Sequence, residues 1–331
     1  MLTREDFNKI AMRLYDFCEY PAVRYNILFH LLNKPYNDKG LSELRQTFLV
    51  SDIVEELYQE QDSYGGWGKF FSKDYSAKDK FPTSATAINR CLYIGLTIED
   101  RDILLRANEY LEDFLKGTAH EKFSNSNERV IPWNTASFCN MIESITPYNE
   151  LCDRTYNEWQ YIAGRAFESG EYSYERERTA QHEVFWTRED RLVPMQTELL
   201  LKRREQISSE IEESMLRHYG EHAYYHGHFW NNFPAQLPET FVYNQTRRWF
   251  HAFNYINQFR GSALYLENSV NWLMNNQNSD GLWDWGTQTK DPWGYFGYFS
   301  TTRNYRHNRV VDCTMEILNF LKKYLDNNTL K

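Results

Sequence analysis

The stretch that decides the fold reads NWLMNNQNSDGLWDWG from Asn271 to Gly286 and continues as TQTKDPWGYFGYFSTTRNYRHNRVVDC from Thr287 to Cys313. Its first half carries Gln277, Gly281 and Trp283 in the frame Gln-x3-Gly-x-Trp, directly after a helix-like segment. Its second half contains a group of basic and acidic residues at the start of an apolar, helix-like segment. We expect the first half to determine the architecture and the second half to carry the chemistry.

The Gln-x3-Gly-x-Trp frame occurs a second time, in QDSYGGWG, as Gln61, Gly65 and Trp67. The two copies are 277 − 61 = 216 residues apart, and each follows a helix-like segment, which indicates an internal repeat. The Gln amide can bond exposed backbone at a helix end, and Gly adopts the positive φ of a tight turn. The Trp ring packs over the turn while its N–H finds a partner. Such a unit ends one helix and fixes it to the next.

These copies resemble the QW motif of the terpenoid cyclases, whose α/α toroid is shared with protein prenyltransferase β subunits. The resemblance implies an all-α protein, with residues 1–331 forming a single α/α-toroid domain, an (α/α)6 barrel-like ring of helical hairpins. Two copies four hairpins apart give about 54 residues per hairpin, so a ring of about twelve helices fits the chain length. An open helical solenoid built from the same hairpins is the alternative.

Composition limits the class of protein. The chain has 331 residues, 41% of them hydrophobic and 17% aromatic, with 15 Gly and 9 Pro, which favours a packed helical core over a loop-rich or disordered chain. A net charge of −9 argues against general nucleic-acid affinity. We find no signal-peptide pattern and no apolar run long enough for a membrane span. Five cysteines without CxxC spacing favour reduced thiols and a cytoplasmic location.

The periodicity of apolar residues predicts helices along most of the chain, with polar outer helices alternating with less polar inner ones. Thr3 is a candidate N-cap with Asp6 three residues later, and Ser51-Asp52 divides a longer helical pattern. The expected helices cover residues 3–17, 25–33, 42–61, 83–96, 99–116, 133–145, 148–167, 192–218, 240–260, 263–276 and 310–325.

The second half of the opening stretch contains Arg306, Arg309, Asp312 and Cys313 at the start of the last predicted helix. This order resembles the zinc-site segment of farnesyl- and geranylgeranyltransferase β subunits. The resemblance implies diphosphate binding by the two arginines and zinc ligation by Asp312, with Cys313 a second candidate ligand. Here Cys313 follows Asp312 without an intervening residue, and no His lies after His307. The alternative is that the arginines bond helix ends and acidic neighbours while Asp312 caps the helix.

Other groups that could carry chemistry are a histidine series and an aromatic loop. His222 and His226 lie four residues apart, a spacing that suits a metal site on a helix. Crowded aromatic residues are typical of isoprenoid cavities and of sugar clefts, although most such rings simply pack in cores. The aromatic candidates are Trp283, Trp285, Trp293 and Tyr295.

Three functional readings follow. The first is a terpenoid cyclase- or prenyltransferase-like protein, transferase- or cyclase-like if it is an enzyme. It would have a central aromatic cavity for an apolar or amphiphilic, possibly isoprenoid-diphosphate ligand, and neither the Asp-x-Asp-Asp nor the Asp-Asp-x2-Asp motif occurs. The second is a carbohydrate-active (α/α)6-barrel hydrolase or lyase, with Glu183, Asp284 and Asp291 as carboxylates to examine. The third is a non-catalytic binding or scaffold protein, with a protein partner. Asp312, Glu183 and Asp284 are thus the candidate catalytic residues.

Overall fold

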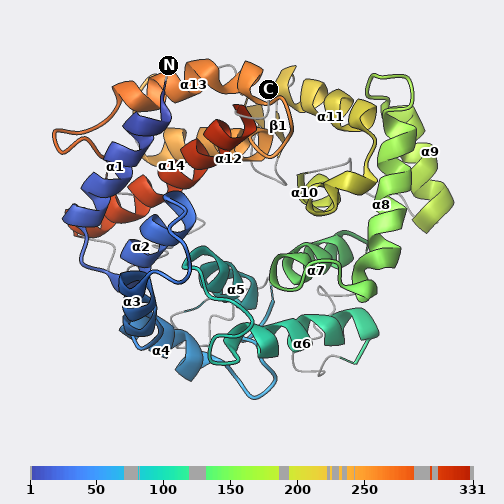
Figure 1. The fold of residues 1–331 in the computed structure, drawn as a ribbon. Coiled ribbons are helices and arrows are strands. Elements are labelled where there is room, and N and C mark those ends of the chain that lie inside the picture. Colours follow the sequence, from blue (N-terminus) through green and yellow to red (C-terminus); the bar gives the residue numbers. More distant parts are fainter. Residues whose placement is uncertain are drawn as a thin grey trace. The chain divides into compact units, whose positions relative to one another are not determined.

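The computed structural model describes residues 2–70, 81, 83–118, 132–185, 194–221, 224–225, 231–232, 237–241, 243–286, 299 and 305–328. These residues form an all-α fold, as predicted (Figure 1). Its only described strands are β1 (Tyr224–Tyr225) and β2 (Asn231–Asn232), which pair antiparallel over two residues each.

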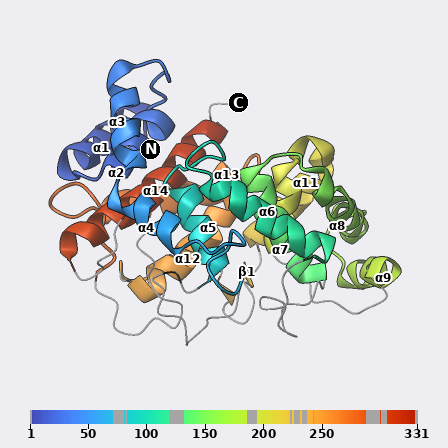
Figure 2. The same ribbon diagram turned by 90° about the horizontal axis from the view of Figure 1, so that it is seen from below.

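The helices follow one another in short hairpins, seen from a second direction in Figure 2. The first group is α1 (Arg4–Phe17), α2 (Pro21–Asn26), the π-helix η1 (Ile27–Leu31), α3 (Lys39–Leu49) and α4 (Asp52–Glu60). The second group is α5 (Ser84–Tyr93), α6 (Ile103–Lys116), α7 (Pro132–Ile145), η2 (Glu150–Cys152), α8 (Asp153–Ala166), α9 (Tyr174–Phe185), α10 (Pro194–Lys202) and η3 (Arg204–Gln206). The last group is α11 (Ser209–Glu221), α12 (Tyr243–Ile256), α13 (Ala263–Asn275) and α14 (Arg306–Asn328).

The chain divides into two compact units, which we describe separately. Unit 1 comprises Met1–Ile53 together with Leu216–Lys331, and unit 2 comprises Val54–Met215. The closure of all hairpins into one toroidal domain therefore stays a prediction.

Unit 1 brings the first and last helices of the chain together. Helix α1 packs against α14, and Arg4 forms a 2.6 Å ion pair with Asp326 near the end of α14. Helix α12 also packs onto α14, where the rings of Phe250 and Phe320 lie 5.2 Å apart. The Asn257 amide, buried after α12, donates to the Phe320 carbonyl at 2.8 Å. Segments from both ends of the sequence thus share one core.

Unit 2 is centred on α7, which contacts α5, α6, α8 and α10. Its core contains an aromatic group in which Phe138 of α7 lies 4.5 Å from Phe70 and 4.9 Å from Phe114 of α6. Helix α9 packs on α8.

Several local predictions are confirmed. Thr3 and Asp6 form a reciprocal capping box at the start of α1, and the helical pattern over 42–61 is broken at Ser51 into α3 and α4. Several boundaries differ from the prediction: α8 begins at Asp153 rather than at Tyr148, the pattern over 192–218 is divided into α10, η3 and α11, and α9 was not predicted. Helix α6 begins at Ile103 rather than at Glu99, because Asp100 accepts hydrogen bonds from Thr97 in a preceding turn.

The last helix also begins earlier than predicted. It begins at Arg306 rather than at Val310, and the Arg309 N–H already bonds to the Tyr305 carbonyl at 3.2 Å. Asp312 consequently lies within the helix, and the prediction that it caps the helix is wrong.

Candidate functional site

The first turn, residues 61–67, follows α4 in unit 2. The Gln61 amide donates to the Gly65 carbonyl at 2.8 Å and to the Ile103 carbonyl at 2.9 Å. Gly65 has a φ of +91°, which a residue with a Cβ adopts only with strain. Trp67 is buried, and its indole N–H donates to the Leu57 carbonyl at 2.9 Å. The turn thereby joins the end of α4 to the start of α6.

The second turn, residues 277–283, follows α13 in unit 1 and repeats the glutamine–glycine and indole–leucine bonds of the first. The Gln277 amide donates to the Gly281 carbonyl at 3.1 Å, and Gly281 has a φ of +70°. Trp283 is completely buried, and its indole N–H donates to the Leu273 carbonyl at 2.7 Å. The repeat inferred from the sequence is therefore a repeat in three dimensions.

The two turns also share positions that the sequence analysis missed. Asp62 and Asn278 follow the glutamine in each copy, and the side-chain oxygen of each accepts backbone N–H groups two and four residues later. The tryptophan backbone N–H donates to a hydroxyl on the next described helix, to Ser84 at 2.8 Å in the first turn and to Thr314 at 3.1 Å in the second. The Asp or Asn that directly follows the glutamine in both copies could have predicted the first of these shared positions.

Arg306 and Arg309 both contact acidic residues of the segment that contains the second turn. Arg309 forms two bonds to Asp284, Nε to Oδ1 and Nη2 to Oδ2, both at 3.2 Å, and each side chain is 15% exposed. Arg306 makes a single 3.1 Å contact with Asp280, and these side chains are 61% and 40% exposed. Both arginines therefore lie in the first turn of α14. Arg309 is held by two bonds in a largely buried pair, whereas Arg306 makes one exposed contact.

The candidate acids of this helix start have defined partners. Asp284 Oδ1 also accepts the Gly286 N–H at 2.8 Å, and Asp312 Oδ1 accepts the Phe299 N–H at 2.9 Å. Cys313 is buried, and burial raises the pKa of its thiol well above the usual range. The thiolate that a zinc ligand requires is thereby disfavoured. Within the described ranges, no three His, Cys, Asp or Glu side chains gather in a way that suits a metal ion.

The aromatic candidates are only partly described. Trp283 is part of the core, and Trp285 is 3% exposed with its ring 5.7 Å from that of Phe250. Four other candidates lie outside the described residues, and the functions predicted for them are untested: Trp293, Tyr295, His222 and His226. Asp291 lies outside them as well.

Glu183 lies on α9 in unit 2, whereas Asp284 belongs to unit 1. Glu183 is exposed and accepts a 2.7 Å hydrogen bond from the Tyr161 hydroxyl, which raises the pKa of that tyrosine. A pairing of Glu183 with Asp284 across a cavity stays a prediction.

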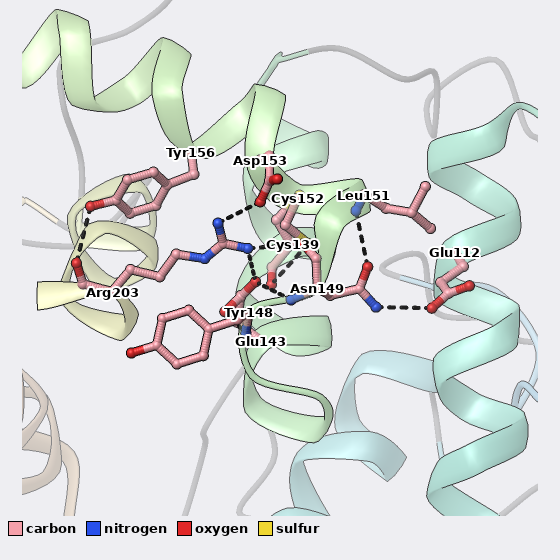
Figure 3. A network of polar contacts seen from close by, with 10 residues as sticks. All are labelled: Glu112, Cys139, Glu143, Tyr148, Asn149, Leu151, Cys152, Asp153, Tyr156 and Arg203. Atoms are coloured by element: carbon pink, nitrogen blue, oxygen red, sulfur yellow. Dashed lines mark hydrogen bonds and ion pairs between the residues drawn. The ribbon is translucent and has the colours of Figure 1, made fainter. Parts of the chain in front are cut away.

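A buried ion network that sequence reasoning missed lies in unit 2 (Figure 3). Arg203, 4% exposed, forms 2.6 Å ion pairs with Glu143 of α7 and Asp153 of α8. Its guanidinium lies over the rings of Tyr148 and Tyr156, at 5.8 and 5.3 Å. Glu143 also accepts the Tyr148 backbone N–H at 2.9 Å. This network joins α7 and α8 to the residue between α10 and η3, and each of its charges has an oppositely charged partner, so it fits a structural role.

The network borders a pair of buried thiols. The Cys152 thiol lies 3.9 Å from the Cys139 carbonyl oxygen. The pKa of Cys152 is raised, most by its contact with Cys139 and next by burial. Thiols in such surroundings are unreactive.

The chain was compared with protein-family models, with curated protein sequences and with solved structures. None of the three comparisons finds a match. Among the described helices, none combines the length and apolar character that crossing a bilayer requires.

Proposed function

We propose that the helical hairpins of this chain close into an α/α toroid that binds an apolar or amphiphilic ligand with an anionic end, of the isoprenoid-diphosphate type. The observation that carries the proposal is that the turns containing Trp67 and Trp283 share the glutamine–glycine bond and the indole–leucine bond. Repeated turns of this design are what a ring of equivalent hairpins requires. The high aromatic content, 17%, suits an apolar ligand.

Within this proposal the two arginines have different functions. Arg306 contacts the anionic end, because its exposed single contact with Asp280 contributes little stability and a diphosphate can replace the carboxylate. Arg309 keeps its two bonds to Asp284 and holds the second turn against α14.

Binding without catalysis is the form of the proposal that the described residues support best. Asp284 and Asp312 each accept a backbone N–H, and Asp284 is also ion-paired, so both are used in holding local structure. The carbohydrate-active reading depends on Glu183, whose exposed contact with Tyr161 leaves it accessible, and it remains the competing hypothesis.

A thermal-shift screen tests the proposal, with farnesyl and geranylgeranyl diphosphate against a set of oligosaccharides and inorganic diphosphate. We expect prenyl diphosphates to raise the melting temperature and Arg306→Ala to remove most of the shift. Arg4→Ala is the matched control, because Arg4 has a similar exposed ion pair in the same unit. A response only to oligosaccharides supports the carbohydrate-active reading, and a shift that survives in Arg306→Ala removes the role of Arg306. Metal analysis of the purified protein tests zinc at Asp312 and Cys313.

A further inference from the structure

The π-helix η1 interrupts the first hairpin of unit 1. The Leu32 N–H bonds to the Ile27 carbonyl, five residues back, at 2.9 Å, and the Lys34 N–H bonds to the Leu28 carbonyl at 2.9 Å. Such widened turns are rare and are frequently found at functional sites, because they change the direction of side chains that an α-helix would bury. The helix ends at Leu31, and Asn33, two residues later, has a φ of +53°.

The widened turn presents aromatic rings in a continuous series from the core to the surface. Tyr25 is 3% exposed and stacks on Phe29 of η1 with ring centroids 5.4 Å apart. Phe29 is half-buried and contacts His30 edge-on at 4.8 Å and Tyr36 edge-on at 6.2 Å. His30 is exposed, and Tyr36 is 75% exposed. We call the rings of Phe29, His30 and Tyr36 the aromatic surface. The buried ring of Tyr25 supports it through the stacking contact with Phe29.

The segment that carries the aromatic surface has a net charge of opposite sign to that of the whole chain. From Pro21 to Leu49 there are four basic residues (Arg24, Lys34, Lys39 and Arg45) and two acidic residues (Asp38 and Glu43), which gives 4 − 2 = +2. The whole chain carries −9.

The two acidic residues of this segment form only long, exposed contacts with its lysines. The Lys34–Asp38 and Lys39–Glu43 distances are 3.8 and 3.9 Å, and the side chain of Lys39 is 93% exposed. Contacts this long and exposed contribute little stability, so another anion can replace them. Arg45 lies over the Tyr25 ring at 4.7 Å and keeps positive charge beside the rings.

We propose that the aromatic surface, together with Lys34 and Lys39, is a docking site for an acidic peptide segment that carries aromatic side chains. A ring of the peptide packs against Tyr36 and Phe29, which contact each other edge-on at 6.2 Å. Its carboxylates pair with Lys34 and Lys39, and the net negative charge of the whole chain disfavours binding of an acidic peptide elsewhere. The site is independent of Arg306 and of the proposed ligand.

The test uses the full chain and immobilised synthetic polymers. The probe is a random copolymer of Glu and Tyr, compared with poly-Glu, with a copolymer of Lys and Tyr, and with vesicles of anionic phospholipid. We expect binding to the Glu-Tyr copolymer that exceeds binding to poly-Glu and weakens at high salt. Tyr36→Ser should weaken it by about tenfold, and Lys34→Gln/Lys39→Gln should reduce both the binding and its salt dependence.

Tyr148→Ser is the control, because Tyr148 is also an exposed tyrosine, 55% exposed, but belongs to unit 2. Circular dichroism melting of each variant shows that the fold is retained. Four results overturn the proposal: no binding to the Glu-Tyr copolymer, equal weakening by Tyr148→Ser, binding to vesicles only, or self-association of the chain that Tyr36→Ser abolishes.

Discussion

Trp67 and Trp283 belong to different compact units, yet each donates its indole N–H to the carbonyl of the residue ten positions earlier, Leu57 at 2.9 Å and Leu273 at 2.7 Å. Each also donates its backbone N–H to a hydroxyl on the following helix. Two segments 216 residues apart thus share these tryptophan bonds, so the turn is a repeated structural unit within this chain.

Replacing either tryptophan by phenylalanine tests whether the indole bonds hold the helices together. Trp67→Phe removes the donor to the Leu57 carbonyl, and we expect a loss of about 1–3 kcal/mol in the free energy of unfolding. Trp283→Phe should cost less, because the Leu273 carbonyl also accepts the Asn276 N–H at 3.0 Å. Trp159→Phe is the control, because the Trp159 indole N–H is buried and makes no hydrogen bond. Urea denaturation of the three variants checks this. Equal losses in all three would mean that lost packing, not the bond, is measured.

The two turn glycines should respond differently to alanine. A Cβ on Gly65 would lie 2.1 Å from the Arg106 carbonyl oxygen, which is backbone and cannot move alone, whereas a Cβ on Gly281 would meet the end of the Arg13 side chain at 2.3 Å. Gly117, with a φ of +71°, has nothing within 4 Å. We expect the loss in the free energy of unfolding to be largest for Gly65→Ala, smaller for Gly281→Ala and smallest for Gly117→Ala. The loss for Gly117→Ala should be about 1–2 kcal/mol, from its positive φ alone.

Thermal melts of the three alanine variants give the order directly. A Gly281→Ala variant as unstable as Gly65→Ala would show that Arg13 cannot move away and is itself fixed against the second turn.

Features that depend on residues close in sequence could be predicted, whereas contacts between residues far apart in the chain could not. Capping by Thr3 and the glycine turns follow from residues close in sequence, so they could be predicted. The ion network of Arg203 could not, because Glu143 is 60 positions away and only the packing of α7 against α10 brings them together. The basic and acidic character of residues 280–312 was evident from the sequence, but the pairing of Arg306 with Asp280 and of Arg309 with Asp284 joins residues 26 and 25 positions apart and could not be predicted.

Arg309 and Arg306 should contribute unequally to stability. Arg309→Ala leaves Asp284 half-buried without its two-point partner, and we expect a loss of about 1–3 kcal/mol. Arg306→Ala breaks an exposed contact and should change the free energy of unfolding by less than about 1 kcal/mol. Chemical denaturation measures both, and the double variant Arg309→Ala/Asp284→Ala should recover part of the loss. If it does not, the pair is not the source of the effect.

The network of Arg203 predicts a strong effect from removing one charge. Arg203→Met leaves Glu143 buried without its cation, and we expect a loss of about 3–5 kcal/mol, measured by urea denaturation. Arg154→Met is the control, because Arg154 pairs with Glu158 while 89% exposed. Replacing Arg203 and Glu143 together by Met and Gln should be less harmful than Arg203→Met alone. An Arg203→Met variant as stable as Arg154→Met would contradict a structural role for the network.

His30 predicts a pH dependence for unit 1. Tyr25 and Phe29 pack against one side of the His30 ring, and the desolvation that results, ahead of the charge of Arg45, lowers the pKa of His30 below its ordinary value of 6.5. The folded state therefore favours the neutral ring, and below pH 6.5 the unfolded chain binds more protons than the folded one. The stability that this histidine contributes is complete above pH 6.5 and is lost as the pH falls from there through the folded pKa. His30→Gln should be less sensitive to acidification over this range.

Urea denaturation of the wild-type chain and of His30→Gln, at several pH values between about 7.5 and 5.5, measures the difference. Comparing the two proteins removes the contribution of the other histidines, which both retain. Carboxylates with lowered pKa, such as Glu55 beside Arg101, lose their contribution only at lower pH, so they do not affect this window. A variant that loses stability as steeply as the wild type would show that His30 titrates normally, and that Arg45 and the surrounding rings do not disfavour its charged form.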